Sequence, residues 1–146
     1  MAQQPRSFTS ITRRHAQGIG GLLVLMAKAL AGDLVFVVSP ATYVRTPITG
    51  AWTRTVRVEL QTAAGELHTW FNKAITSGFS VADTSSAGTA TIPSTTATYA
   101  DGVATVVITG SANAWLNAET DTLTVTAATI LGYTVASKTS VETFTT

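Results

Sequence analysis

The residues that could carry out hydrolysis are few in this sequence. It contains two histidines, His15 and His68, and no cysteine, so no thiol nucleophile or thiolate metal ligand is available. His15 lies in a basic stretch, and we expect His68, close to Trp70, at the surface or rim of a strand. The Gly-x-Ser-x-Gly motif, which presents a nucleophilic serine, is absent. The sequence therefore predicts no catalytic residues and no enzyme activity.

Two acidic residues, Glu119 and Asp121, are close enough in sequence to share a cation. Calcium usually takes about six to eight oxygen ligands, so two carboxylates are a weak indication, and a solvated loop is the better interpretation. Gly18-Ile19-Gly20-Gly21 precedes an apolar run but lacks the preceding strand, lysine and hydroxyl residue of a phosphate-binding loop. We therefore predict no metal and no cofactor.

Three tryptophans, Trp52, Trp70 and Trp115, could form an aromatic platform for a carbohydrate. The alternative is structural, because an indole supplies a large apolar surface and β-sandwiches often bury one tryptophan. If the chain binds a carbohydrate or receptor, we expect the binding surface near Trp52 or Trp115.

Charge divides the chain into two unlike parts. Residues 1–57 contain seven basic residues and one acidic residue, a net charge of +6, whereas residues 58–146 contain two basic and seven acidic residues, a net charge of −5. Such asymmetry indicates that one end meets an anionic partner, although two solvated faces without a partner would give the same pattern.

The predicted partner-binding residues lie in the basic N-terminal part. Residues 1–17 are polar and read as an extended arm, and a short apolar helix is expected from about Gly21 to Ala31. Three arginines are too few to indicate nucleic acid, so we expect them to bind an acidic protein surface. The residues predicted to bind the partner, by charge and by apolar burial respectively, are Arg6, Arg13 and Arg14, and Leu22, Leu23, Leu25 and Met26.

Three interpretations remain open for residues 19–38. A transmembrane helix is disfavoured because Lys28 and Asp33 interrupt the apolar run, so no membrane partner is expected. A secretory signal would have Arg13 and Arg14 before the apolar stretch and a cleavage site at Ala29-Leu30-Ala31. We favour an assembly arm that a partner subunit ties down. The β-branched residues 33–39, which end at Pro40, predict a strand buried on both faces.

From Thr53 onward, short alternating segments predict an all-β domain. In residues 55–61, Val56, Val58 and Leu60 share one face, while Arg57 and Glu59 share the other. Asp101-Gly102 predicts a hairpin turn before a strand over residues 103–109, and residues 122–127 repeat the alternation. Seven or eight such strands without a helix among them favour a sandwich or barrel.

Residues 53–146 resemble bacterial and phage immunoglobulin-like modules of the invasin and intimin type. The resemblance rests on three segments, residues 56–65, 99–109 and 121–127. It implies an immunoglobulin-like β-sandwich, residues 51–146, preceded by an N-terminal docking element, residues 1–50, with a basic arm, short helix and strand. Such modules occur in tandem in adhesins, whereas this sequence has one module and no internal repeat.

As a whole, the chain looks most like a phage capsid decoration (cement) protein or another minor virion protein. This resemblance implies location in the virion, the major capsid protein or another virion protein as partner, and a homo-oligomer, with a trimer as one candidate. The alternative expectation is an exported or cell-surface module that binds a carbohydrate or receptor, with residues 1–31 as its signal peptide.

Overall fold

The computed structural model describes residues 33–146. Every regular element in this range is a β-strand, which confirms the prediction of an all-β domain. Between residues 33 and 146 there is accordingly no helix with the length and apolar character needed to cross a membrane. The predicted arm and short helix lie outside the described residues, as do all the predicted partner-binding residues, Arg6, Arg13, Arg14, Leu22, Leu23, Leu25 and Met26.

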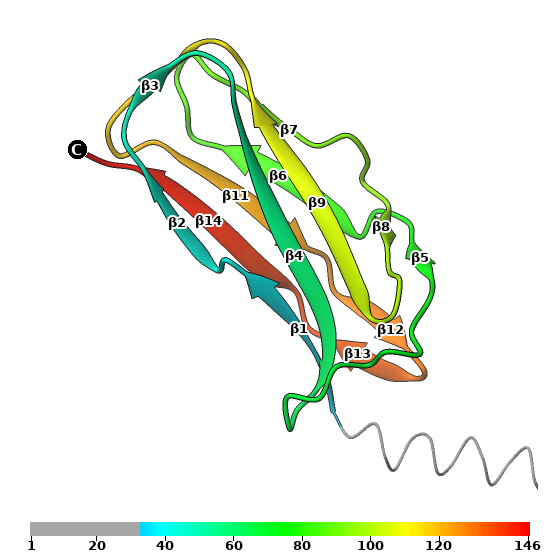
Figure 1. The fold of residues 1–146 in the computed structure, drawn as a ribbon. Helices are drawn as coiled ribbons and strands as arrows, with labels where there is room; N and C mark the ends of the chain where they lie inside the picture. Colours follow the sequence, from blue (N-terminus) through cyan, green and yellow to red (C-terminus); the bar gives the residue numbers. More distant parts are fainter. Residues whose placement is uncertain (1–32) are drawn as a thin grey trace, which may run out of the picture. The chain divides into compact units, whose positions relative to one another are not determined.

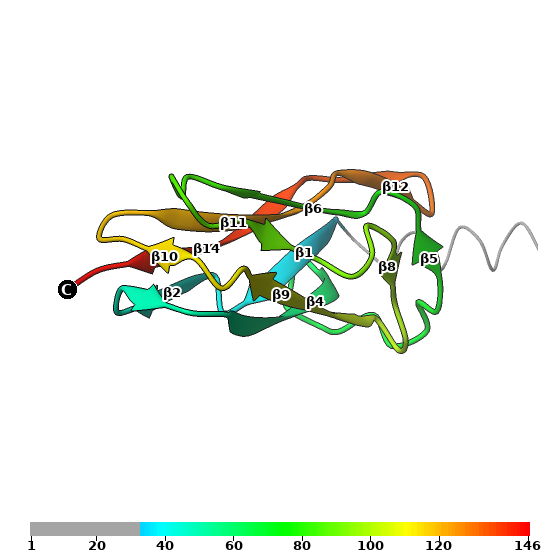
Figure 2. The ribbon, with the colours of Figure 1, turned by 90° about the horizontal axis from the view of Figure 1, so that it is seen from above.

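Two four-stranded sheets make up most of the fold and lie in two layers (Figures 1 and 2). The first has the order β1-β4-β9-β7, with β1 at Leu34–Ser39, β4 at Trp52–Thr62, β9 at Val103–Gly110 and β7 at Ala90–Thr91. The second has the order β2-β14-β11-β6, with β2 at Thr42–Arg45, β14 at Lys138–Phe144, β11 at Thr120–Val125 and β6 at Phe79–Asp83. The strands within each sheet pair antiparallel except β2, which runs parallel to β14.

The alternation of side chains along β4 sets the core between the sheets. Val56, Val58 and Leu60 are fully buried, whereas Thr55 and Arg57 face outward, as the sequence pattern predicts. On β9, Ala104, Val106 and Ile108 are buried in the same way. The second sheet contributes the buried residues Leu123, Val125 and Phe144 from β11 and β14. The core is therefore a layer of inward-facing residues from both sheets.

The sandwich begins earlier than the predicted boundary at residue 51. Residues 34–39 form β1 in the first sheet and pair with β4, and after the cis Ser39–Pro40 bond the chain crosses to the second sheet as β2. The predicted strand at residues 33–39 is therefore present, but Leu34 and Phe36 are buried while Val37 is exposed. It is consequently buried on one face and not on both.

Three two-stranded sheets close the ends of the sandwich. They pair β3 (Ile48–Thr49) with β10 (Ala114–Trp115), β5 (Ala74–Ile75) with β8 (Ala97–Thr98), and β12 (Ala128–Ile130) with β13 (Tyr133–Val135). Figure 1 shows β5, β8, β12 and β13 at the end where β1 begins, and β3 at the opposite end, beside the C-terminus. The first described strand and the C-terminus thus lie at opposite ends of the sandwich.

The order of the strands is consistent with an immunoglobulin-like sandwich. In that fold strands A, B, E and D form one sheet and strands C, F and G the other. Here β1, β4, β9 and β7 take the positions of A, B, E and D, and β6, β11 and β14 take those of C, F and G. β2 continues strand A along the edge of the second sheet.

Candidate binding pocket and buried ion-pair network

His68 is a buried structural residue. Its side chain is 6% exposed and packs edge to face against Trp70, outside any regular strand. Burial lowers the pKa of its imidazole, since the charged form would lose hydration. The expectation of a surface or rim position in a strand is therefore wrong, because the chain turns at residues 69 and 70 where a returning strand was predicted.

The carboxylate of Glu119 accepts hydrogen bonds from two backbone amides. One carboxylate oxygen accepts hydrogen bonds from the Ser86 amide at 2.8 Å and its hydroxyl at 3.0 Å, and the other accepts from the Leu116 amide at 2.8 Å. These hydrogen bonds, led by that from Leu116, lower the pKa of Glu119 to about 2. Glu119 thus ties the loop after β6 to the loop before β11, and the prediction of a solvated loop is wrong for this residue.

Asp121 lies inside the sandwich, on β11, and is fully buried. Arg54 reaches it from the facing sheet, with Nη2 2.5 Å from Asp121 Oδ1 and Nη1 2.6 Å from the Ser140 hydroxyl. The Nε of Arg54 also lies 3.2 Å from Glu142 Oε2 on β14, and Arg45 donates a hydrogen bond to the other oxygen of Glu142. Two arginines and two carboxylates therefore form an ion-pair network that links β2, β4, β11 and β14.

Burial dominates the titration of Asp121. Burial, together with the adjacent Glu142, raises the pKa of this carboxyl group to about 7, although Arg54 opposes the shift. Asp121 and Glu142 face each other across β11 and β14 in the register of the sheet. Glu119 accepts hydrogen bonds from the loops beside β6 and β11, whereas Asp121 lies inside the sandwich against Arg54, so these two carboxylates do not face a common cation.

Trp52 and Trp115 belong to the core and cannot form an exposed sugar-binding surface. They are 4% and 1% exposed, and their rings meet edge to face at 5.1 Å between centroids. Phe144 stacks on Trp115 at 5.0 Å and completes this aromatic cluster. Neither indole can therefore stack on a carbohydrate, because both are covered by other side chains.

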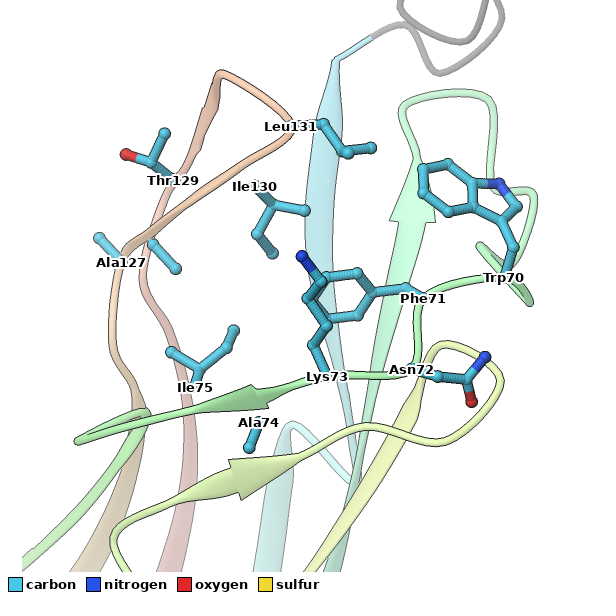
Figure 3. A pocket seen from close by; sticks show the side chains of 11 residues that line it. Trp70, Phe71, Asn72, Lys73, Ala74, Ile75, Ala127, Thr129, Ile130 and Leu131 are labelled. Atoms are coloured by element: carbon cyan, nitrogen blue, oxygen red, sulfur yellow. The ribbon is translucent and has the colours of Figure 1, made fainter. Parts of the chain in front are cut away.

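Trp70 is the exposed tryptophan, with 51% of its surface accessible, and it stands at the edge of a pocket. The pocket has a volume of about 460 Å³ and is lined by two continuous segments, residues 70–75 and residues 127–131. In Figure 3, Trp70 lies to the right of the Phe71 ring, Leu131 above it and Ile130 to its left. Its size falls within the range of about 300–1,000 Å³ that is typical of ligand sites.

Lys73 is the one cationic residue that lines this pocket. Its amino group points among the apolar lining side chains towards Ile130 (Figure 3), and it forms no ion pair with another described residue. Asn72 lies at the rim, where its side-chain oxygen accepts a hydrogen bond from the Asp101 amide at 2.8 Å. Most of the lining side chains are therefore apolar, and Lys73 supplies the one positive charge among them.

Sequence reasoning missed the pocket and the network for different reasons. The alternation that places Val56 inward also places Arg54 inward, so the period of the strand contained that signal. The pocket joins segments more than 50 residues apart, and neither segment carries a motif. Comparison of the chain with protein-family models and with curated proteins found no match.

Proposed function

We propose that this chain is a structural virion protein, specifically a phage capsid decoration protein. In this proposal, residues N-terminal to the sandwich dock on the major capsid protein or another virion protein, and the immunoglobulin-like sandwich projects from the particle or clasps a neighbouring subunit. Its action is mechanical: it bridges capsid subunits as a homo-oligomer, with a trimer as one candidate. Catalysis, nucleic acid and membranes have no part in this proposal.

The distribution of charge carries the proposal. Among the seven basic residues of the first 57, Arg45, Arg54 and Arg57 each pair with a carboxylate of the sandwich. The other four, Arg6, Arg13, Arg14 and Lys28, all belong to residues 1–32. Residues 1–32 carry a net charge of +4 and residues 33–146 a net charge of −3. The positive charge that an acidic partner could recognise is thus concentrated before the sandwich.

The position of the ends of the sandwich also supports the proposal. β1 begins at one end, and the C-terminus lies at the other (Figure 1). A module held at the end where β1 begins would present its opposite end, with β3 and the C-terminus, away from the attachment point. This geometry suits a protein that is anchored by its N-terminal region and displayed on a surface.

The first test is the mass and size of the protein recovered from its native source. Intact-mass and N-terminal analysis, with sedimentation, should find the full-length chain in a very large particle. A chain that begins at Gly32 and sediments as a small species would overturn the proposal.

A second test addresses the arm directly. Simultaneous Arg6→Glu, Arg13→Glu and Arg14→Glu substitution should abolish co-sedimentation of the full-length chain with particles that lack it. Lys138→Glu, an equivalent charge reversal per site on β14, is the control and should leave co-sedimentation intact. Equal co-sedimentation of the triple variant and the control would show that the arginines do not anchor the chain.

The second candidate function is an exported binding module, with residues 1–31 as its signal peptide. The pocket beside exposed Trp70 favours it, because ligand sites are typically concave, with mostly apolar lining side chains and a few polar groups. On this alternative, the binding surface is at Trp70 and not near Trp52 or Trp115. Cleavage after Ala31 in the native source would support it over the virion function.

A further inference from the structure

The pocket beside Trp70 has two walls that are edges of small β-sheets. β5 pairs only with β8, and β12 pairs only with β13, so within residues 33–146 each has one edge without a partner strand. Both edge strands line the pocket, β5 through Ala74 and Ile75 and β12 through residues 128–130. An unpaired edge offers backbone donors and acceptors to another extended chain.

The register of these strands shows which backbone groups are offered. The Tyr99 amide donates to the Lys73 carbonyl at 2.8 Å, so Lys73 and Tyr99 form a hydrogen-bonded pair of the antiparallel ladder. Because such pairs alternate with non-hydrogen-bonded ones, the next pair, Ala74 with Thr98, directs the N–H and C=O of Ala74 away from β8.

The same rule applies to the opposite wall. β12 and β13 are joined by the two-residue turn Leu131-Gly132, in which both residues have positive φ, 54° and 82°, so the closing pair Ile130–Tyr133 is hydrogen-bonded. The N–H and C=O of Thr129, one residue further, are therefore directed away from β13. The side chain of Thr129 points away from the other lining side chains (Figure 3), so Thr129 borders the pocket with its main chain.

Between these walls the pocket presents exposed apolar side chains beside a positive charge. Trp70 and Leu131 are 51% and 41% exposed at its mouth. Covering large apolar side chains of this kind removes them from water, which favours the binding of a partner. Lys73 contributes an ammonium group without an ion-pair partner among residues 33–146. A carboxylate placed next to an apolar side chain would therefore complement the pocket in charge and in polarity.

We propose that this pocket binds an extended segment of a partner protein that presents a large apolar side chain next to an acidic residue. The apolar side chain enters between Trp70 and Leu131, the carboxylate meets Lys73, and the backbone pairs with the free edge at Ala74 or Thr129. This combination of backbone pairing with a side-chain pocket is the mode of β-strand addition. The inference does not depend on the proposed function, since a virion protein and an exported module could both use it.

An acidic sugar is the competing ligand, because it too could stack on Trp70 and reach Lys73. The lining favours a peptide: most of the lining side chains are apolar, and the side-chain oxygen of Asn72 already accepts a hydrogen bond from Asp101. A sugar ring would need several polar partners for its hydroxyl groups, and it could not continue the regular ladder of backbone hydrogen bonds that an extended chain forms with a strand edge.

The test is a selection of random, terminally blocked 8-residue peptides on the full-length protein, followed by titration of the enriched peptides. We expect a consensus with an aromatic or branched apolar residue adjacent to Asp or Glu. Lys73→Glu and Trp70→Ala should each weaken binding by about tenfold or more. Lys138→Glu reverses a charge on β14, outside the pocket, and should leave the affinity unchanged.

Two further readouts separate a peptide strand from other ligands. A backbone N-methyl group at alternate peptide positions should weaken binding, and the amide NMR signals of Ala74 and Thr129 should shift on titration. No enriched consensus, a basic consensus, or an affinity that Lys73→Glu leaves unchanged would overturn the proposal. Binding of N-acetylneuraminic acid that is abolished by Trp70→Ala, without binding of any peptide, would replace it with an acidic-sugar site.

Discussion

Asp121 and Glu142 lie directly opposite each other on β11 and β14, and Arg54 reaches both of them from the facing sheet. Both carboxylates are fully buried, and Arg45 supplies a second guanidinium at the edge of the sheet. Ser140 extends the arrangement, since its hydroxyl accepts from Arg54 and donates to the Pro40 carbonyl at 2.6 Å. Buried ion pairs as well as apolar packing therefore hold the two sheets together.

Loss of Arg54 should be among the most destabilising changes in the sandwich. Arg54→Met keeps much of the apolar volume but leaves two buried carboxylates with fewer partners, which typically costs about 3–5 kcal/mol of unfolding free energy. Urea denaturation monitored by tryptophan fluorescence would measure the loss. Arg57→Met on the exposed face of the same strand is the matched control, because an exposed ion pair contributes only about 0–1 kcal/mol. A similar small loss in both variants would contradict the importance of the network.

Asp121 should make stability depend on pH in an unusual direction. Its pKa in the folded protein is raised to about 7 from an ordinary value of 3.8, so the folded state holds a proton that the unfolded chain releases. The stability from this proton is fully present below about pH 4 and is lost as the pH rises through 7, with a slope of at most about 1.4 kcal/mol per pH unit. The pKa of His68 is lowered, so His68 has the opposite effect on stability: its contribution is lost as the pH falls below about 6.5. A variant that changes Asp121 alone is therefore needed to separate the two groups.

Asp121→Asn isolates this contribution, because the amide resembles the protonated acid. The difference in unfolding free energy between Asp121→Asn and the natural chain should grow in favour of the variant between pH 5 and pH 8. Chemical denaturation at several pH values would measure it, and His68 contributes equally to both proteins. A difference that does not change with pH would show that Asp121 does not titrate in this range.

Glu119 should produce the opposite dependence. Its pKa is lowered to about 2 by the amides of Leu116 and Ser86, so its stabilising contribution is present above its ordinary pKa of 4.5 and is lost as the pH falls towards 2. Glu119→Gln should lower the thermal midpoint at pH 7, and the two proteins should converge near pH 2. Glu66→Gln, in the exposed turn after β4, is the control and should leave the thermal midpoint at pH 7 close to that of the natural chain.

The sequence predicted the strands whose apolar alternation is regular. β4 and β11 were expected from the positions of residues such as Val56 and Leu123, which the structure buries, and β9 from the Asp101-Gly102 turn that precedes it. Charged residues in phase with them were not assigned to the core, because a buried charge is stable only with a partner and the partners of Arg54 lie on other strands. Asp121 is 67 residues away in sequence, so only the pairing of the sheets brings the two together.

The same limit applies to the pocket and to the tryptophans. Composition could not separate Trp70 from Trp52, since exposure depends on which segments fold over each indole. The wall at residues 127–131 contains the short strand β12, and it meets residues 70–75 only because both close one end of the sandwich.

Close packing of Trp52 on the backbone of β9 gives the last prediction. A Cβ atom added at Gly110 would lie 2.1 Å from the indole, closer than atoms can approach, and Trp52 cannot move because Trp115 and Phe144 pack against it. Gly110→Ala should therefore lower the unfolding free energy by about 1–3 kcal/mol, the usual cost of overpacking. Thr105→Ala, on the exposed face of the same strand, should cost less than about 1 kcal/mol, because it alters no core contact. Thermal unfolding followed by near-ultraviolet circular dichroism would report both stability and the environment of the indoles. An unchanged midpoint and unchanged aromatic signal in Gly110→Ala would contradict this packing.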